Sequence, residues 1–158
     1  MNKILVPTDF TVKSLSLLRE TIARQTEKVN IVLVYGTNLS DCTVDMLFYT
    51  RTEQIDKLLE PNFLESLNIL KNKHASVING VCMDIYHGYS GNAFENYITA
   101  HGITDAYIPL DKSSRAKNSR LISSIKKSKL PVCEVALPME VVYQTSGSFA
   151  KLMTSKTN

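Results

Sequence analysis

The stretch KILVPTDF, residues 3–10, decides the fold of this chain. Its apolar residues 4–6 follow one another without a polar side chain, so both sides of the strand must be covered, as in the inner strands of parallel α/β sheets. Pro7 has no N–H to donate and ends the strand. Asp9 comes directly after it, where open α/β sheets bind their ligands. The stretch therefore predicts a central strand followed by a candidate binding carboxylate.

Asp9 also has a purely structural interpretation. Aspartate side chains commonly accept hydrogen bonds from nearby backbone N–H groups and so order a turn. The residues around Asp9 do not by themselves decide between this role and ligand binding.

Length and composition indicate a single globular domain. The 158 residues fit the usual size of one domain, and a hydrophobic share of 44% is enough for a core. We expect this domain over residues 1–137 and a C-terminal extension over 138–158, with a short strand at Met139–Tyr143 before a frayed tail. No apolar run is long enough to span a bilayer, and no apolar signal core opens the chain. We therefore expect a cytoplasmic protein without a membrane partner.

The charged and metal-binding residue types give few functional signals. Three cysteines and three histidines are scattered without metal-ligand spacing, so we expect no metal site. Seven lysines and arginines lie within residues 112–129, a cluster that can attract phosphates. The alternative is a solvated helix face whose last-turn lysines complement the helix dipole. Without a recognition motif, this segment is poor support for nucleic-acid binding.

Apolar patterns along the chain alternate between strands and helices. After the first strand, strands are predicted at 29–35, 76–86, 105–110 and 130–136, and the third of the five is expected at a sheet edge. Helices are predicted at 14–25, 41–73 with a break at Pro61, 92–101 ending at Gly102, and after a cap at Ser113 or Ser114. This alternation predicts an α/β fold with a mostly parallel sheet and helices on both faces.

The same sequence resembles the universal stress protein family. The opening stretch with Ser14 is similar to that family's first strand and turn, and similar features recur at Gly88, at 101–105 (HGITD) and at 130–132 (LPV). The resemblance covers the chain to about Ala136. It implies a single five-stranded, Rossmann-like parallel sheet of order 3-2-1-4-5. It also implies that Asp9 faces the adenine of a bound nucleotide.

The chain departs from the family pattern after the fourth strand. Nucleotide-binding members carry a Gly-x2-Gly-x9-Gly-Ser/Thr loop there, whereas residues 110–118 contain no glycine and Asn118-Ser119 stand in the place of the last pair. A side chain at such a position blocks close approach of the backbone to a phosphate. We therefore expect a non-catalytic stress-response or interaction protein that has no cofactor and does not bind ATP tightly. No nucleophile, base and orienting acid occur in motif order, so we expect no enzyme.

The alternative is a protein that binds ATP or AMP through side-chain donors at a helix N-terminus instead of glycines. The nucleotide cleft would then comprise ten residues: Pro7, Thr8, Asp9, Val34, Lys112, Ser113, Ser114, Arg115, Asn118 and Ser119.

The last strand suggests how the protein associates. Residues Val132 to Ala136 are too apolar for an uncovered sheet edge, and family members commonly dimerise through this strand. We expect a homodimer built on this strand and the segment that follows it. The alternative is that Met139–Tyr143 folds back and covers its own edge.

Overall fold

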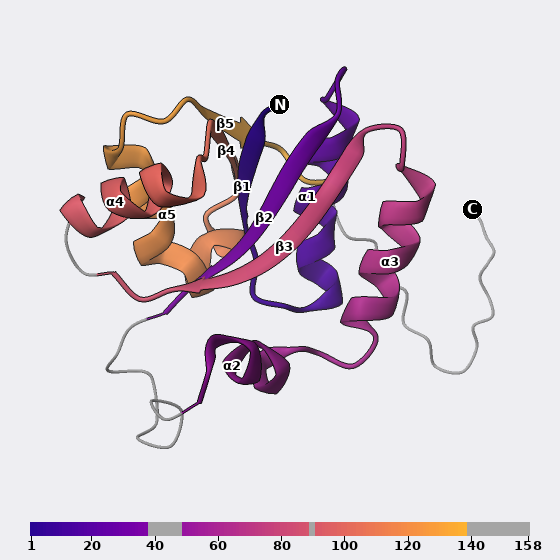
Figure 1. Cartoon of the computed structure of the whole chain (residues 1–158), viewed down its shortest axis with the longest axis horizontal. Coiled ribbons are helices and arrows are strands. Elements are labelled where there is room, and N and C mark those ends of the chain that lie inside the picture. Colours follow the sequence, from indigo (N-terminus) through magenta and orange to yellow (C-terminus); the bar gives the residue numbers. More distant parts are fainter. Residues whose placement is uncertain (38–48, 89–90, 139–158) are drawn as a thin grey trace.

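The protein forms one parallel sheet of five strands in the order β3-β2-β1-β4-β5 (Figure 1). The structure, a computed structural model, describes residues 1–37, 49–88 and 91–138. The strands are β1 (Lys3–Pro7), β2 (Val29–Gly36), β3 (Ile78–Tyr86), β4 (Asp105–Pro109) and β5 (Val132–Val135). The predicted strand order is confirmed, including the edge position of β3.

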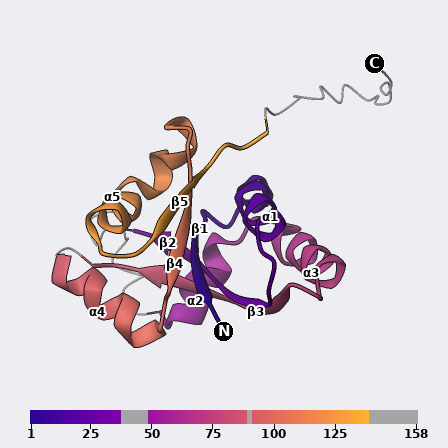
Figure 2. The same cartoon turned by 90° about the horizontal axis from the view of Figure 1, so that it is seen from above.

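Helices cover both faces of the sheet, as predicted. Figure 2 shows α1 and α3 on one face and α4 and α5 on the other. The helices are α1 (Leu15–Ala23), α2 (Arg51–Leu58), α3 (Phe63–Lys73), α4 (Gly91–His101) and α5 (Ser119–Lys127), with short 3-10 turns η1 (Val12–Ser14) and η4 (Ser113–Asn118). Among the helices in these described ranges, none has both the length and the apolar character needed to cross a bilayer.

β1 lies in the middle of the sheet because both of its faces are apolar. Ile4 and Val6 pack with α1 and α3, while Leu5 packs with α4 and α5, as the alternation of side chains along a strand requires. All three side chains are fully buried. The interpretation of residues 3–7 as an inner strand is therefore confirmed.

Two predicted helix boundaries are also confirmed. Pro61 lies between α2 and α3, where its missing N–H breaks no helical hydrogen bond. Gly102 follows α4 with φ of +66°, a conformation that favours glycine at a helix end.

The predicted cap of the last helix is wrong. Ser113 and Ser114 begin the 3-10 turn η4, and α5 starts only at Ser119 with Asn118 as its N-cap residue. The position of α5 is set by packing: a Cβ added at Gly36 would lie 2.5 Å from Leu121 Cβ, so this helix contacts the end of β2 directly. The chain from β4 reaches that position through η4. The strand expected at Met139–Tyr143 lies outside the described residues.

Candidate functional site

A cavity of about 490 Å³ opens at the carboxyl ends of β1 and β4. These neighbouring strands form the point where the sheet reverses its winding, which is the usual ligand position in open α/β folds. Asp9 lies on this cavity together with Ser114 and Asn118 from η4. Asp9 therefore lines the same cavity as residues of the segment that follows the fourth strand.

The carboxylate of Asp9 already has protein partners. Its Oδ1 accepts hydrogen bonds from the Thr11 N–H at 3.1 Å and the Thr11 hydroxyl at 2.5 Å, and its Oδ2 lies 3.4 Å from Lys117 Nζ. Burial raises the pKa of Asp9, but the hydrogen bonds from Thr11 and the charge of Lys117 outweigh it and hold the pKa below its ordinary value. Asp9 therefore orders the turn and also reaches across the cavity to η4.

Asn118 joins the ends of two strands through its side-chain amide. Its Nδ2 donates to the Thr8 carbonyl at 3.0 Å, and its Oδ1 accepts from the Gly36 N–H at 2.8 Å. The residue is 6% exposed. At the position where the family pattern has a glycine, a buried side chain thus binds the Thr8 carbonyl and the Gly36 N–H.

Half of the predicted cleft residues gather at the cavity. Pro7, Thr8, Asp9, Ser114 and Asn118 line it. The described side chains that do not line it are Val34, Lys112, Arg115 and Ser119, and the side chain of Ser113 lies outside the description.

These side chains do not line the cavity for different reasons. Val34 is fully buried in the apolar core between the sheet and α5. Arg115 is turned toward β5, because its Nε donates to the Pro109 carbonyl at 2.7 Å and its Nη2 lies 3.5 Å from Glu134. A cradle that relies on Arg115 is therefore not assembled at this cavity.

Sequence reasoning missed Lys117, Thr11 and the inward position of Ser14. Ser14 lines the cavity, and its hydroxyl lies 2.8 Å from the Thr8 hydroxyl. Lys117 lines the cavity three residues after Ser114, and a 3-10 turn places residues i and i+3 on the same side. The signal was present in that spacing, but it required η4 to be recognised as a 3-10 turn.

A second polar cluster surrounds Asp84, near the carboxyl end of β3. This carboxylate is 5% exposed; its Oδ1 accepts from the Ile85 N–H at 2.8 Å and lies 3.1 Å from Arg51 Nε. Its Oδ2 accepts from the Tyr97 hydroxyl at 2.7 Å and lies 3.4 Å from His101 Nε2. Burial, together with Asp84, raises the pKa of Tyr97. Among the described residues, no group of three or more His, Cys, Asp or Glu side chains could hold a metal ion.

The comparisons with known proteins agree on the fold. The structure of hypothetical protein PH0823 matches 88% of this chain and 98% of its own, with a TM-score of 0.54 and 17% identity. The structure of hypothetical protein MJ0577 matches the same shares with a TM-score of 0.53 and 22% identity. The chain has a universal stress protein-like fold.

A third structure, of a universal stress protein family member from Burkholderia pseudomallei, matches 85% of this chain and 95% of its own, with a TM-score of 0.49 and 13% identity. No protein-family model and no curated protein matches the sequence.

Proposed function

We propose that this universal stress protein-like chain is a non-catalytic stress-response or interaction protein of the cytoplasm that does not bind ATP tightly. The observation that carries the proposal is the side chain of Asn118. It is buried at the point where the sheet reverses its winding, and it already binds the Gly36 N–H and the Thr8 carbonyl.

The chemistry of the crevice supports this proposal. A phosphate nest needs several free backbone N–H groups that a ligand can approach closely. Here the Gly36 N–H is taken by Asn118, and the segment from Leu110 to Asn118 contains no glycine. A nucleotide in the family's position would have to displace a satisfied buried amide.

The state of Asp9 argues against its acting as a general base. An efficient general base has a pKa near the working pH. The contacts with Thr11 and Lys117 instead hold the pKa of Asp9 below its ordinary value, so its carboxylate is a weak base. Asp9 therefore stabilises the turn.

Calorimetric titration with ATP and with AMP tests the proposal. We expect no binding tighter than about 100 μM. Mass spectrometry of natively purified and then denatured protein should likewise find no retained nucleotide. The variant Asn118→Gly is the informative partner, because it frees the Gly36 N–H and should bind ATP more tightly than the native chain. A sub-micromolar ATP affinity of the native protein would contradict the proposal.

The second candidate function is adenine-nucleotide binding, which the size of the cavity favours. Its volume of about 490 Å³ falls within the usual range for ligand pockets. Lys117 is the cation that would meet the phosphates after leaving Asp9, to which it is only loosely held at 3.4 Å with 66% of its side chain exposed. If ATP binds, Lys117→Ala should abolish binding, whereas Lys112→Ala, which removes an equal charge outside the cavity, should leave it unchanged.

A further inference from the structure

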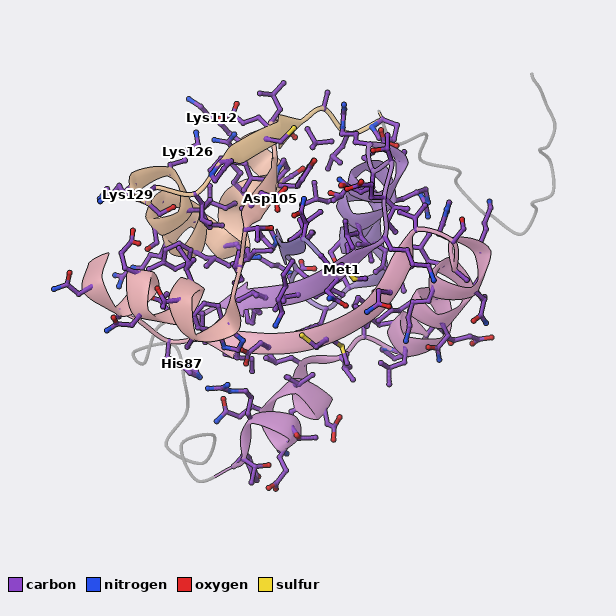
Figure 3. The ribbon with its side chains drawn as sticks, turned by 45° about the horizontal axis from the view of Figure 1, so that its top comes forward. Met1, His87, Asp105, Lys112, Lys126 and Lys129 are labelled. Carbon is purple, nitrogen blue, oxygen red and sulfur yellow. The ribbon has the colours of Figure 1, made fainter. Side chains whose placement is uncertain are left out.

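The basic charge of the protein is concentrated in one segment of the chain. Residues 111–134 contain seven lysines and arginines and two acids, a net charge of +5, whereas the whole chain carries +3. The remaining residues therefore carry −2. Figure 3 shows Lys112, Lys126 and Lys129 along the same side of the molecule, over α5 and β5.

This surface is hollowed. A depression of about 420 Å³ runs along η4 and α5 and is lined by Arg115, Ser119, Ile122, Ser123, Lys126 and Lys127. We call these six residues the basic groove. The groove adjoins β5, because Arg115 and Lys126 both contact Glu134 of that strand.

Glu134 shows which chemistry the basic groove accepts. One carboxylate oxygen, its Oε1, lies 3.5 Å from Arg115 Nη2 and 3.2 Å from Lys126 Nζ. The side chains of Glu134 and Lys126 are 40% and 44% exposed, so this contact is weak and open to exchange. Arg115 is 15% exposed and is fixed by its bond to the Pro109 carbonyl, so a ligand meets a guanidinium that is already ordered.

The edge of β5 offers backbone hydrogen bonds beside these cations. β5 is the last strand in the described sheet. The carbonyls of Pro131 and Val135 accept from β4, so by alternation the N–H groups of Val132 and Glu134 point away from β4. An extended peptide can add to such an edge through its main chain. Its alternate side chains would then lie on the face that carries Glu134 and the basic groove.

We propose that this surface binds an extended acidic segment of another protein, which adds to the edge of β5 and places its carboxylates in the basic groove. The proposal rests on the function proposed above and names the chemistry of the partner. Charge complementarity selects this occupant. The chain's own residues 139–158 carry two lysines and one glutamate and do not complement a basic surface.

A second copy of the chain is the competing occupant, expected from the sequence. In a twofold pairing of β5 with itself, the α5 helices of the two copies would lie on the same face of the joined sheet. The two basic grooves would then meet with like charges, which opposes association. An acidic partner removes this repulsion.

Fluorescence anisotropy with a labelled dodecapeptide of alternating glutamate and threonine tests the proposal on the full chain. We expect binding that weakens at least tenfold in the double variant Lys126→Glu, Lys127→Glu. The matched control is Lys71→Glu, Lys73→Glu, which changes two lysines in the last turn of α3 on the other face of the sheet. This control should keep the native affinity within about twofold, because interactions between exposed charges beyond about 10 Å are largely screened by 0.1 M salt.

Further readouts separate the proposal from its competitors. Hydrogen exchange at the amides of Val132 and Glu134 should slow when the peptide binds, which a purely electrostatic contact would not cause. A peptide of alternating lysine and threonine should not bind. Equal loss of affinity in both double variants, complete displacement by millimolar inorganic phosphate, or light scattering that shows a dimer with β5 protected before peptide is added would overturn the proposal. ATP titration of the same samples tests the proposed function independently.

Discussion

Asp9 and Asp84 are both carboxylates near the carboxyl ends of parallel strands, yet their surroundings differ in kind. Asp9 follows the central strand, is 22% exposed, and takes two of its contacts from Thr11, two residues away. Asp84 lies in the edge strand, is 5% exposed, and joins α2 and α4 to β3 through Arg51, Tyr97 and His101. The difference shows that Asp9 fixes a turn, whereas Asp84 holds three elements together.

The substitution Asp84→Ala should give the largest loss of stability. The Tyr97 hydroxyl and the Ile85 N–H would lose their acceptor in a buried setting, and we expect the free energy of unfolding to fall by about 3 kcal/mol. Urea denaturation measures this loss of stability. Asp56→Ala, at an exposed position of α2, is the matched control and should change stability by less than about 0.5 kcal/mol. Similar losses in the two variants would contradict the comparison.

The second-largest loss of stability is expected at Asn118. Its side chain joins two segments beside the Asp9 cavity, as Asp84 joins elements at the edge strand. Asn118→Ala leaves the Gly36 N–H and the Thr8 carbonyl without their partner and should lower the free energy of unfolding by about 2 kcal/mol. Thermal denaturation followed by circular dichroism checks this value. Asn96→Ala, at an exposed position of α4, provides the reference. A loss no greater than the reference would mean that water replaces the amide without penalty.

The sequence predicted those parts of the fold that depend on local chemistry. The apolar run at 4–6 predicted an inner strand, Pro61 predicted the break before α3, and Gly102 predicted the end of α4, because each reflects a steric or hydrogen-bonding property of the residue itself. The turn-ordering interpretation of Asp9 depends on local chemistry in the same way. Its turn contacts lie within two residues along the chain.

What the sequence could not predict depends on contacts between distant segments. The start of α5 is set by packing of Leu121 on Gly36, which overrides the capping preference of Ser113 and Ser114. The Asp84 cluster is built from side chains of three elements, and no sequence motif indicates it. Arg115 belongs to a basic segment that suggested phosphate binding, but the nearby Pro109 carbonyl and Glu134 direct its guanidinium elsewhere.

A smaller loss of stability is expected for Asp9→Asn, and its size should depend on pH. The pKa of Asp9 is lower in the folded state than in the unfolded state, so its charge stabilises the fold above the unfolded-state pKa of about 4. That contribution is lost as the pH falls through the lower folded-state pKa. We expect Asp9→Asn to be less stable by about 0.5 to 1 kcal/mol at pH 7, because Thr11 keeps an acceptor and only the charged contacts are lost. The difference in stability between the native chain and Asp9→Asn should disappear toward pH 3 in urea titrations. A gap independent of pH would show that the charge of Asp9 does not matter.

The smallest effect is expected at His87, whose titration reports on the Asp84 cluster. Burial lowers the pKa of His87, the charge of Arg51 lowers it further, and Asp84 opposes both. The Nδ1 of His87 is buried without a partner in the described part of the chain, so protonation would add a buried donor that nothing accepts. Figure 3 shows His87 near the end of β3, on the side toward α2.

The folded-state pKa of His87 thus lies below the unfolded-state value of about 6.5, and the stabilisation from its neutral form is complete above that pH. It is lost as the pH falls through the folded-state value. The native chain should therefore lose more stability between pH 7.5 and pH 5 than His87→Gln does. Nuclear magnetic resonance sharpens the test: the pKa of His87 should rise in Arg51→Gln and fall in Asp84→Asn. Movement of the His87 pKa in the same direction in both variants would show that these two charges do not act on His87 as the geometry requires.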